Sequence, residues 1–389
     1  MKDWTVLFLF FFPLGSGLAG NGVQKLNIPS ALLKAAPSGS ILRMQDTLQY
    51  DGPYIFYQRD KIITRLVVQV NGKNSLQEDS LPVSQKQNLV LSVKTDEPGK
   101  FFQVHLKEKL VNEKNVFKGV QKQFVVSDIE GNFSAFRKLL QSNGVIDQEL
   151  NWTFGNGHLV LTGDFFDRGE QVTETLWFIY SLEDKARAAG GYVHYILGNH
   201  EIMNLTSDLR YVNPKYIANA TLLGIKYGSL YDGNTELGRW LRTKNIIERI
   251  GQVLFMHGGI SPEVNRMDLS VKDIDQIARP YYADTLYGYK DQRLNILLGD
   301  LGPFWYRGYY PGSATTTAEQ IDSTLRQFKI RHIATGHSIV ADTVSMWYNG
   351  RLFNTDTHHA SGKSEALFME GNKYYRVNAT GNKVLLLTD

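Results

Sequence analysis

Side chains able to carry out chemistry cluster at five places in this sequence, each soon after a short apolar run. The clusters supply carboxylates, one amide and several imidazoles, in the order Asp128, Glu130, Asp164, Asp167, Asn199, His200, His257 and His337. Each cluster by itself is weak evidence for a functional site, because an isolated Asp or His usually serves in a turn, a cap or a structural contact. Taken together, these oxygen and imidazole donors suit two divalent ions about 3.5–4 Å apart that share one carboxylate. Such a donor set favours manganese, iron or zinc over calcium.

The part of the chain that carries these clusters alternates between strand, loop and helix. Apolar runs predict buried strands at residues 124–126, 159–161, 192–197, 253–256 and 332–335, and helical periodicity follows near 133–140 and 172–189. In α/β proteins, ligands bind beyond the carboxyl ends of the strands, which is where the polar clusters lie. The sequence therefore predicts an α/β fold with an active site at these strand ends.

Five motifs in this order resemble those of the calcineurin-like metallophosphoesterases, and specifically their phosphoprotein-phosphatase branch. The motifs are Asp128-Ile129-Glu130-Gly131-Asn132, Gly163-Asp164-Phe165-Phe166-Asp167-Arg168-Gly169, Gly198-Asn199-His200-Glu201, His257-Gly258-Gly259 and Gly336-His337. The Asp-Arg-Gly ending of the second motif and the Asn-His-Glu of the third are typical of that branch. The resemblance covers roughly residues 120–360. It implies an α/β (α+β sandwich) core of β-sheets flanked by helices over residues 118–389.

The resemblance also implies a set of metal ligands. Asp128 would bind the first ion and Asp164 would bridge both. The second ion would be completed by Asn199, His257 and His337. Two cations offset the negative charge of a phosphate ester, and a hydroxide bridging them attacks phosphorus in line.

The same resemblance implies roles in phosphate binding and proton transfer. Arg168 would hold the phosphate oxygens, and His200, oriented by Asp167, would act as the general acid that protonates the departing alkoxide. The family places a further phosphate-binding arginine between the last two motifs, and Arg307 is its predicted counterpart. At that point the sequence is similar to the bacterial, Shewanella-like type. The predicted activity is metal-dependent hydrolysis of phosphate monoesters, in the manner of a protein phosphatase.

The first motif departs from the family pattern, which reads Asp-x-His, because Glu130 stands in the place of the histidine. Either Glu130 ligates the first ion and adds a negative charge to it, or it is a bystander. As a ligand it favours manganese over zinc, since harder ions prefer oxygen; iron and zinc remain alternatives. The later cluster Asp356-Thr357-His358-His359 either lines the site, compensating for Glu130, or is solvated.

Composition and the N-terminus limit the remaining possibilities. The 389 residues carry a net charge of +3 and no cysteine, which argues against a dedicated nucleic-acid binder and excludes disulfides and thiolate ligands. Lys2, the apolar run 4–14 and the small residues 15–20 predict a signal peptide over residues 1–20, cut after Ala19. We therefore expect a periplasmic or secreted protein with no integral membrane segment after cleavage.

Residues 21–117 are predicted to form a tether followed by a small β-rich accessory domain. Its hairpins are expected at residues 54–57 with 62–70 and at 89–93 with 101–106, the latter pair flanking Glu97-Pro98-Gly99. The substrate expected for the whole chain is a phosphorylated protein or a small phosphate ester. Two other functions stay open: a dinucleotide-polyphosphate hydrolase, which shares the motifs, and a catalytically silent module that only binds a phosphorylated ligand.

Overall fold

The computed structural model of this chain describes residues 40–41, 50–285, 288–312 and 315–389. The predicted signal peptide lies outside the described residues, and so does the predicted tether apart from a two-residue strand, β1 (Ser40–Ile41). Both therefore stay predictions. Within the described ranges, none of the helices combines the length and apolar character that a membrane span requires.

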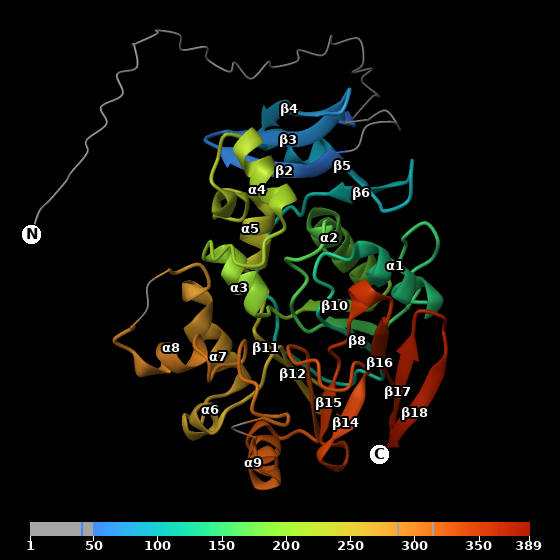
Figure 1. The fold of residues 1–389 in the computed structure, drawn as a ribbon, viewed down its shortest axis with the longest axis vertical. Helices are drawn as coiled ribbons and strands as arrows, with labels where there is room; N and C mark the ends of the chain where they lie inside the picture. Colours follow the sequence, from blue (N-terminus) through green and yellow to red (C-terminus); the bar gives the residue numbers. More distant parts are fainter. Residues whose placement is uncertain (1–39, 42–49, 286–287, 313–314) are drawn as a thin grey trace, which may run out of the picture.

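Two six-stranded sheets form the centre of the fold (Figure 1). The first sheet has the spatial order β10 (Tyr192–Tyr195), β9 (His158–Leu161), β8 (Lys122–Val126), β16 (Glu365–Glu370), β17 (Lys373–Asn378) and β18 (Lys383–Thr388). The second has the order β14 (Ser345–Trp347), β15 (Leu352–Asn354), β13 (His332–Thr335), β12 (Val253–Met256), β11 (Ile247–Ile250) and β7 (Val116–Phe117). Strands β8, β9 and β10 are parallel, as are β12, β13 and β15, so their carboxyl ends meet at shared sheet edges.

Alternation of side chains along the inner strands explains how these sheets pack. Val125 of β8 and Val160 of β9 lie in one buried cluster with Phe255 of β12, so the two sheets face each other. Phe124 and Leu159, one residue earlier, point the other way into a second buried cluster that includes the helices. Strands covered on both faces read as continuous apolar runs, which is why the sequence identifies them.

Helices cover the outer faces of the sandwich (Figure 1). They are α1 (Phe133–Ser142) and α2 (Val172–Ala188) on the first sheet, α3 (Asn199–Leu205), α4 (Pro214–Leu222) and α5 (Glu236–Leu241) in the connection between the sheets, and α6 (Pro262–Arg266), α7 (Val271–Ala278), α8 (Gln292–Leu297) and α9 (Ala318–Phe328) on the second sheet's side. The predicted α/β sandwich of β-sheets flanked by helices is confirmed.

The N-terminal part is β-rich, as predicted. Its strands form two three-stranded sheets: β2 (Tyr50–Gln58), β3 (Lys61–Val70) and β4 (Lys73–Pro82) in one, and β1, β5 (Leu89–Lys94) and β6 (Phe101–His105) in the other. Both predicted hairpins are present, as β2–β3 and β5–β6. This part packs on α2, where the Phe102 and Phe178 rings lie 5.7 Å apart and the Trp177 indole donates to the Pro53 carbonyl at 2.8 Å.

Candidate metal centre

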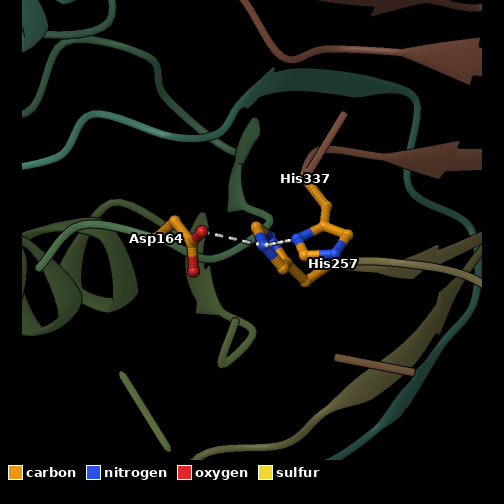
Figure 2. A group of neighbouring side chains, drawn as sticks. All are labelled: Asp164, His257 and His337. Carbon is orange, nitrogen blue, oxygen red and sulfur yellow. Dashed lines mark hydrogen bonds and ion pairs between the residues drawn. The ribbon is translucent and has the colours of Figure 1, made fainter. Parts of the chain in front are cut away.

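Loops at the carboxyl ends of β8, β9, β12 and β13 bring four predicted ligands together. The backbone N–H of His337 donates to Asp128 Oδ2 at 3.1 Å. His257 Nε2 lies 3.0 Å from Asp164 Oδ2 and 3.1 Å from His337 Nδ1 (Figure 2). One ligand atom from each of Asp164, His257 and His337 lies within 4.8 Å of the other two. Residues far apart in the sequence therefore converge on one point.

Two glycines allow the loops to approach this closely. A Cβ atom on Gly336 would lie 2.3 Å from Asp128 Oδ2, and one on Gly198 would lie 2.3 Å from Asp164 Oδ1. The ligands themselves adopt an uncommon backbone conformation, with φ of 53° at Asp128, 61° at Asp164 and 68° at His337. Non-glycine residues held in this region cost free energy and concentrate at functional sites. The local backbone is thus shaped to aim these side chains.

Backbone carbonyls fix the orientation of both imidazoles. His257 Nδ1 lies 2.7 Å from the Thr162 carbonyl oxygen, and His337 Nε2 lies 3.1 Å from that of Trp305. A carbonyl oxygen can only accept, so these two ring nitrogens carry the protons. In the neutral rings, His257 Nε2 and His337 Nδ1 are then both lone-pair nitrogens, and they face each other. Two acceptors cannot satisfy one another, whereas a proton or a cation between them satisfies both.

Two oxygens complete this set of acceptors. Asn199 Oδ1 lies 2.9 Å from His257 Nε2, and Asp164 contributes its carboxylate. Burial by itself lowers the pKa of His257, but the carboxylates of Asp164 and Asp128 outweigh it and raise that pKa to about 9. The surroundings therefore favour positive charge at this point. Two imidazoles, an amide and a carboxylate fit the second divalent ion expected from the sequence.

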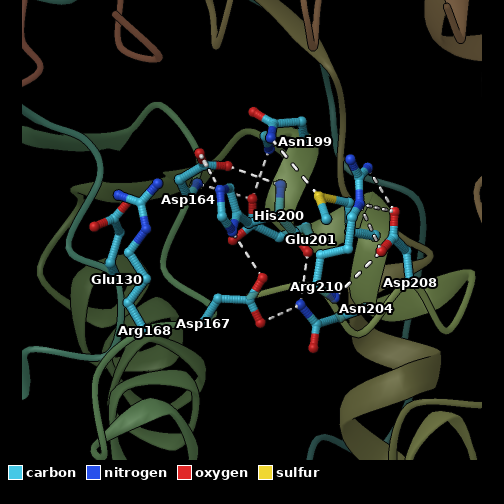
Figure 3. A network of polar contacts seen from close by, with 12 residues as sticks. Glu130, Asp164, Asp167, Arg168, Asn199, His200, Glu201, Asn204, Asp208 and Arg210 are labelled. Carbon is cyan, nitrogen blue, oxygen red and sulfur yellow. Dashed lines mark hydrogen bonds and ion pairs between the residues drawn. The ribbon is translucent and has the colours of Figure 1, made fainter. Parts of the chain in front are cut away.

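Glu130 also reaches the cluster. Ligand atoms of Glu130, Asp164 and His200 lie within 4.8 Å of one another. The Glu130 carboxylate accepts a hydrogen bond from the guanidinium of Arg168 (Figure 3). Glu130 therefore lies beside the cluster, and its charge is partly engaged by the arginine. Its role as a metal ligand stays a prediction.

His200, the predicted general acid, faces the same cluster. Its Nδ1 lies 2.7 Å from Asp167 Oδ2, while Asn204 Nδ2 donates to Asp167 Oδ1 at 2.8 Å (Figure 3). The other ring nitrogen, Nε2, lies 3.7 Å from Asp164 Oδ2. Burial lowers the pKa of His200, but Asp164 and Asp167 more than compensate and raise it to about 9. The carboxylates around the ring therefore favour its protonated form, which is the form that the predicted general acid needs.

Both predicted phosphate-binding arginines lie at the edge of the cluster. The Arg168 side chain is 51% exposed, and its guanidinium lies 5.6 Å from the centre of the Tyr211 ring. Arg307 donates to the His337 carbonyl and to Ser338 Oγ, the latter at 3.1 Å. Two guanidiniums therefore reach the centre from different loops.

Glu201 was not singled out from the sequence, although it belongs to the Asn-His-Glu motif. Its carboxylate accepts hydrogen bonds from the backbone N–H groups of Asp164 at 2.9 Å, Phe165 at 2.8 Å and Gly198 at 2.6 Å. The side chain is fully buried. Glu201 therefore ties the loop after β9 to the loop after β10 and helps to position Asp164.

The two histidines of the later cluster lie outside the site. His358 is exposed and its Nδ1 lies 2.8 Å from Asp342 Oδ1. His359 is buried, with its Nε2 3.3 Å from Thr357 Oγ1. Neither imidazole belongs to the groups of neighbouring ligand atoms among the described residues, and neither do the carboxylates of Asp128 and Asp356. Of this cluster, only Asp356 interacts with the carboxylates of the centre.

The sequence profile of the calcineurin-like phosphoesterases matches residues 122–341, which include every motif described above. This chain belongs to the calcineurin-like phosphoesterase family. A crystal structure of the cold-active protein-tyrosine phosphatase of a psychrophilic Shewanella species is similar to it, with a TM-score of 0.77 and 35% identity. That likeness covers 87% of this chain and 100% of the other.

Two curated relatives carry the Shewanella-like name. Shewanella-like protein phosphatase 1 of Plasmodium berghei is 25% identical over 61% of this chain and 66% of its own length. Shewanella-like protein phosphatase 2 of Arabidopsis thaliana is 35% identical over 25% of each chain. The chain thus spans less than two thirds of the length of these two relatives. The resemblance to the Shewanella-like branch is confirmed, and this calcineurin-like phosphoesterase is a hydrolase of phosphate esters.

Proposed function

We propose that this phosphoesterase is an exported, manganese-dependent protein phosphatase that acts on phosphotyrosine. One observation carries the proposal: the hydrogen-bonded pair His200–Asp167 and the two arginines all lie around a single group of potential metal-ligand atoms. The phosphotyrosine specificity is supported by the likeness to a protein-tyrosine phosphatase over 87% of the chain.

The residues of this chain have separable tasks in the proposed reaction. When bound, the divalent ions supply an activated water and offset the charge of the phosphate. Arg168 and Arg307 bind the phosphate oxygens, which orients the ester for in-line displacement. His200 Nε2 donates its proton to the departing oxygen, and Asp167 holds the ring in position through Nδ1. The amide of Asn204 keeps the Asp167 carboxylate aimed at His200.

A groove beside the centre suits an aromatic leaving group. It has a volume of about 330 Å³, and its lining combines the apolar and aromatic Met203, Tyr281, Tyr289 and Trp305 with the charged Asp208, Arg210, Asp284 and Asp300. The Trp305 ring lies 5.9 Å from the His337 ring, so the groove opens next to the predicted second ion. The aromatic side chains of this lining stabilise a phenyl ring more than the short side chain of phosphoserine. This favours phosphotyrosine over phosphoserine.

Export is proposed from residues 1–20, whose pattern is that of a cleavable signal peptide. Expression of the full chain in a Gram-negative host, followed by fractionation and N-terminal sequencing, tests it. We expect a periplasmic product that begins at Gly20. A cytoplasmic product that retains Met1 and Lys2 contradicts the proposal.

The activity is tested on chelator-treated protein reloaded with manganese, iron or zinc. We expect the highest rate with manganese, a greater kcat/KM for phosphotyrosyl than for phosphoseryl peptides, and no turnover without metal. Faster hydrolysis of a dinucleoside tetraphosphate would favour the dinucleotide-polyphosphate hydrolase. Tight binding of the phosphotyrosyl peptide with no turnover under any metal would favour the silent binding module.

A further inference from the structure

The two halves of the metal centre differ in their donor atoms. One half has the imidazoles of His257 and His337 beside the Asn199 amide. The other half has Glu130, whose ligand atom lies near those of Asp164 and His200, and Asp128, which interacts electrostatically with Glu130 and Asp164. The Nδ1 atom of His200 is engaged by Asp167, so the carboxylates are the donors that remain in this half. The Glu130 carboxylate is already hydrogen-bonded to Arg168, so it is less available to a metal ion. The half with Asp128 and Glu130 therefore needs a further ligand atom.

Contacts among three hydroxyl groups show that the segment after β15 lies beside the half that contains Asp128. Thr355 Oγ1 lies 3.0 Å from Ser127 Oγ and 3.4 Å from Thr162 Oγ1. These three residues directly follow β15, β8 and β9, so the ends of the three strands meet there. The next residue along two of these segments is a carboxylate, Asp128 after Ser127 and Asp356 after Thr355. The topology therefore delivers Asp356 to the same place as Asp128.

The loop that carries Asp356 is fixed by its own hydrogen bonds. The backbone N–H of Asp356 donates to Asn354 Oδ1 at 2.9 Å, and Asn354 Nδ2 donates to the Ser338 carbonyl at 2.7 Å. Asp356 is 4% exposed. Within the described part of the chain its carboxylate has no hydrogen-bond or ion-pair partner, unlike the carboxylates of Asp164 and Glu130.

The charges around this carboxylate are mostly of its own sign. Burial raises the pKa of Asp356 well above its ordinary value, and the neighbouring Glu130 and Asp164 raise it further, against the opposing effect of Arg307 and Arg168. A buried carboxylate without a partner is costly, and placing it among other carboxylates adds repulsion. A divalent cation removes both penalties at once.

We infer that Asp356 is a ligand of the first metal ion and completes a half-site built only from carboxylates. The inference rests on the proposed metal dependence. The all-oxygen half-site selects a hard cation such as Mn²⁺, while the half with two imidazoles also accepts softer ions. The two ions are consequently held by different chemistry and with different affinities.

The test is Mn²⁺ binding to chelator-stripped protein, measured by calorimetry and by metal content after desalting. The variant is Asp356→Asn, which keeps the shape and removes the charge. Its matched control is Asp342→Asn, because Asp342 is a nearby surface carboxylate bonded to His358 and Lys363. We expect two ions in the parent and in the control. In Asp356→Asn we expect one ion with parental affinity and the other weakened at least about tenfold.

Thermal unfolding separates a ligand from a merely structural residue. Without metal, Asp356→Asn and Asp356→Ala should unfold at or above the parental temperature, because repulsion between carboxylates is relieved. With Mn²⁺, both should gain less stability than the parent. Two ions bound with parental affinity, or an equal loss of stability with and without metal, would overturn the inference. A parent that binds no Mn²⁺ would instead overturn the proposed function.

Discussion

At the scale of single residues, the chemistry depends on which atom of each side chain is already engaged. The backbone carbonyls of Thr162 and Trp305 each accept a hydrogen bond from one ring nitrogen, of His257 and His337 respectively. The other nitrogen of each ring is left for a cation. Asp167 occupies Nδ1 of His200 in the same way and leaves Nε2 directed towards the cluster. The same type of residue therefore serves as ligand or as acid, according to its partner.

The first residue-scale prediction concerns His200 as general acid. His200→Asn should lower kcat by roughly 10²–10⁴-fold for an alkyl phosphate, because an alkoxide leaves poorly without a proton. The loss should be much smaller for p-nitrophenyl phosphate, whose leaving group is already stable. Steady-state kinetics on both esters, with metal content measured alongside and His358→Asn as the surface control, check this. Equal losses on the two esters would mean that His200 is structural.

The second residue-scale prediction concerns the two arginines. Arg168→Lys and Arg307→Lys should each lower kcat/KM by about tenfold or more and weaken inhibition by inorganic phosphate, because lysine cannot make a planar two-pronged contact. Arg266→Lys is the matched control, since Arg266 pairs with Glu263 on the surface. Parental kcat/KM in Arg307→Lys, with unchanged phosphate inhibition, would remove Arg307 from the site.

At the scale of elements, the centre is made by strand ends and the short loops that follow them. These elements could be predicted, because a strand buried on both faces is a continuous apolar run and the polar residue after it stands out. β4 escaped prediction because its sequence, KNSLQEDSLP, is polar and does not alternate. The contacts of Glu201 also escaped, since its bond to the Asp164 N–H joins residues 37 positions apart.

The prediction at this scale concerns the loop after β13. Gly336→Ala places a Cβ atom 2.3 Å from Asp128 Oδ2 and 2.8 Å from Ser127 Oγ, so the loop or the carboxylate must move. We expect a fall in kcat of about 10²-fold from misplacement of the ligands, with a stability cost of about 1–3 kcal/mol. Gly233→Ala is the control, because nothing lies within 4 Å of its added atom. Activity assays and thermal unfolding together check this, and parental activity in Gly336→Ala would contradict it.

At the scale of the whole molecule, the fold brings together residues that the sequence leaves far apart. The His337 N–H and Asp128 Oδ2 are 209 positions apart, and Ser127 and Thr355 are 228 apart. The family motifs specify most of the predicted ligands because they are local patterns. They do not reveal Asp356 as a neighbour of Asp128, because that proximity exists only once β15 has taken its place in the second sheet beside β13.

The fold also gives different surroundings to two residues that are adjacent in the sequence, His358 and His359. His358 is exposed, whereas His359 is 2% exposed and burial lowers its pKa to about 4. In the unfolded chain a histidine has a pKa near 6.5. Between these two values the unfolded state takes up a proton that the folded state does not bind, so stability falls as the pH decreases.

We therefore predict that the free energy of unfolding decreases between about pH 6.5 and pH 4 in part because His359 is buried neutral. The contribution is up to about 3 kcal/mol, from 1.36 kcal/mol per pKa unit. Denaturant unfolding of metal-free protein across this range should show a shallower pH dependence in His359→Gln than in the parent. The slope is the deciding quantity, since a glutamine at position 359 also alters packing by an amount independent of pH. Parallel curves for the parent and His359→Gln would show that other groups cause the loss of stability in acid.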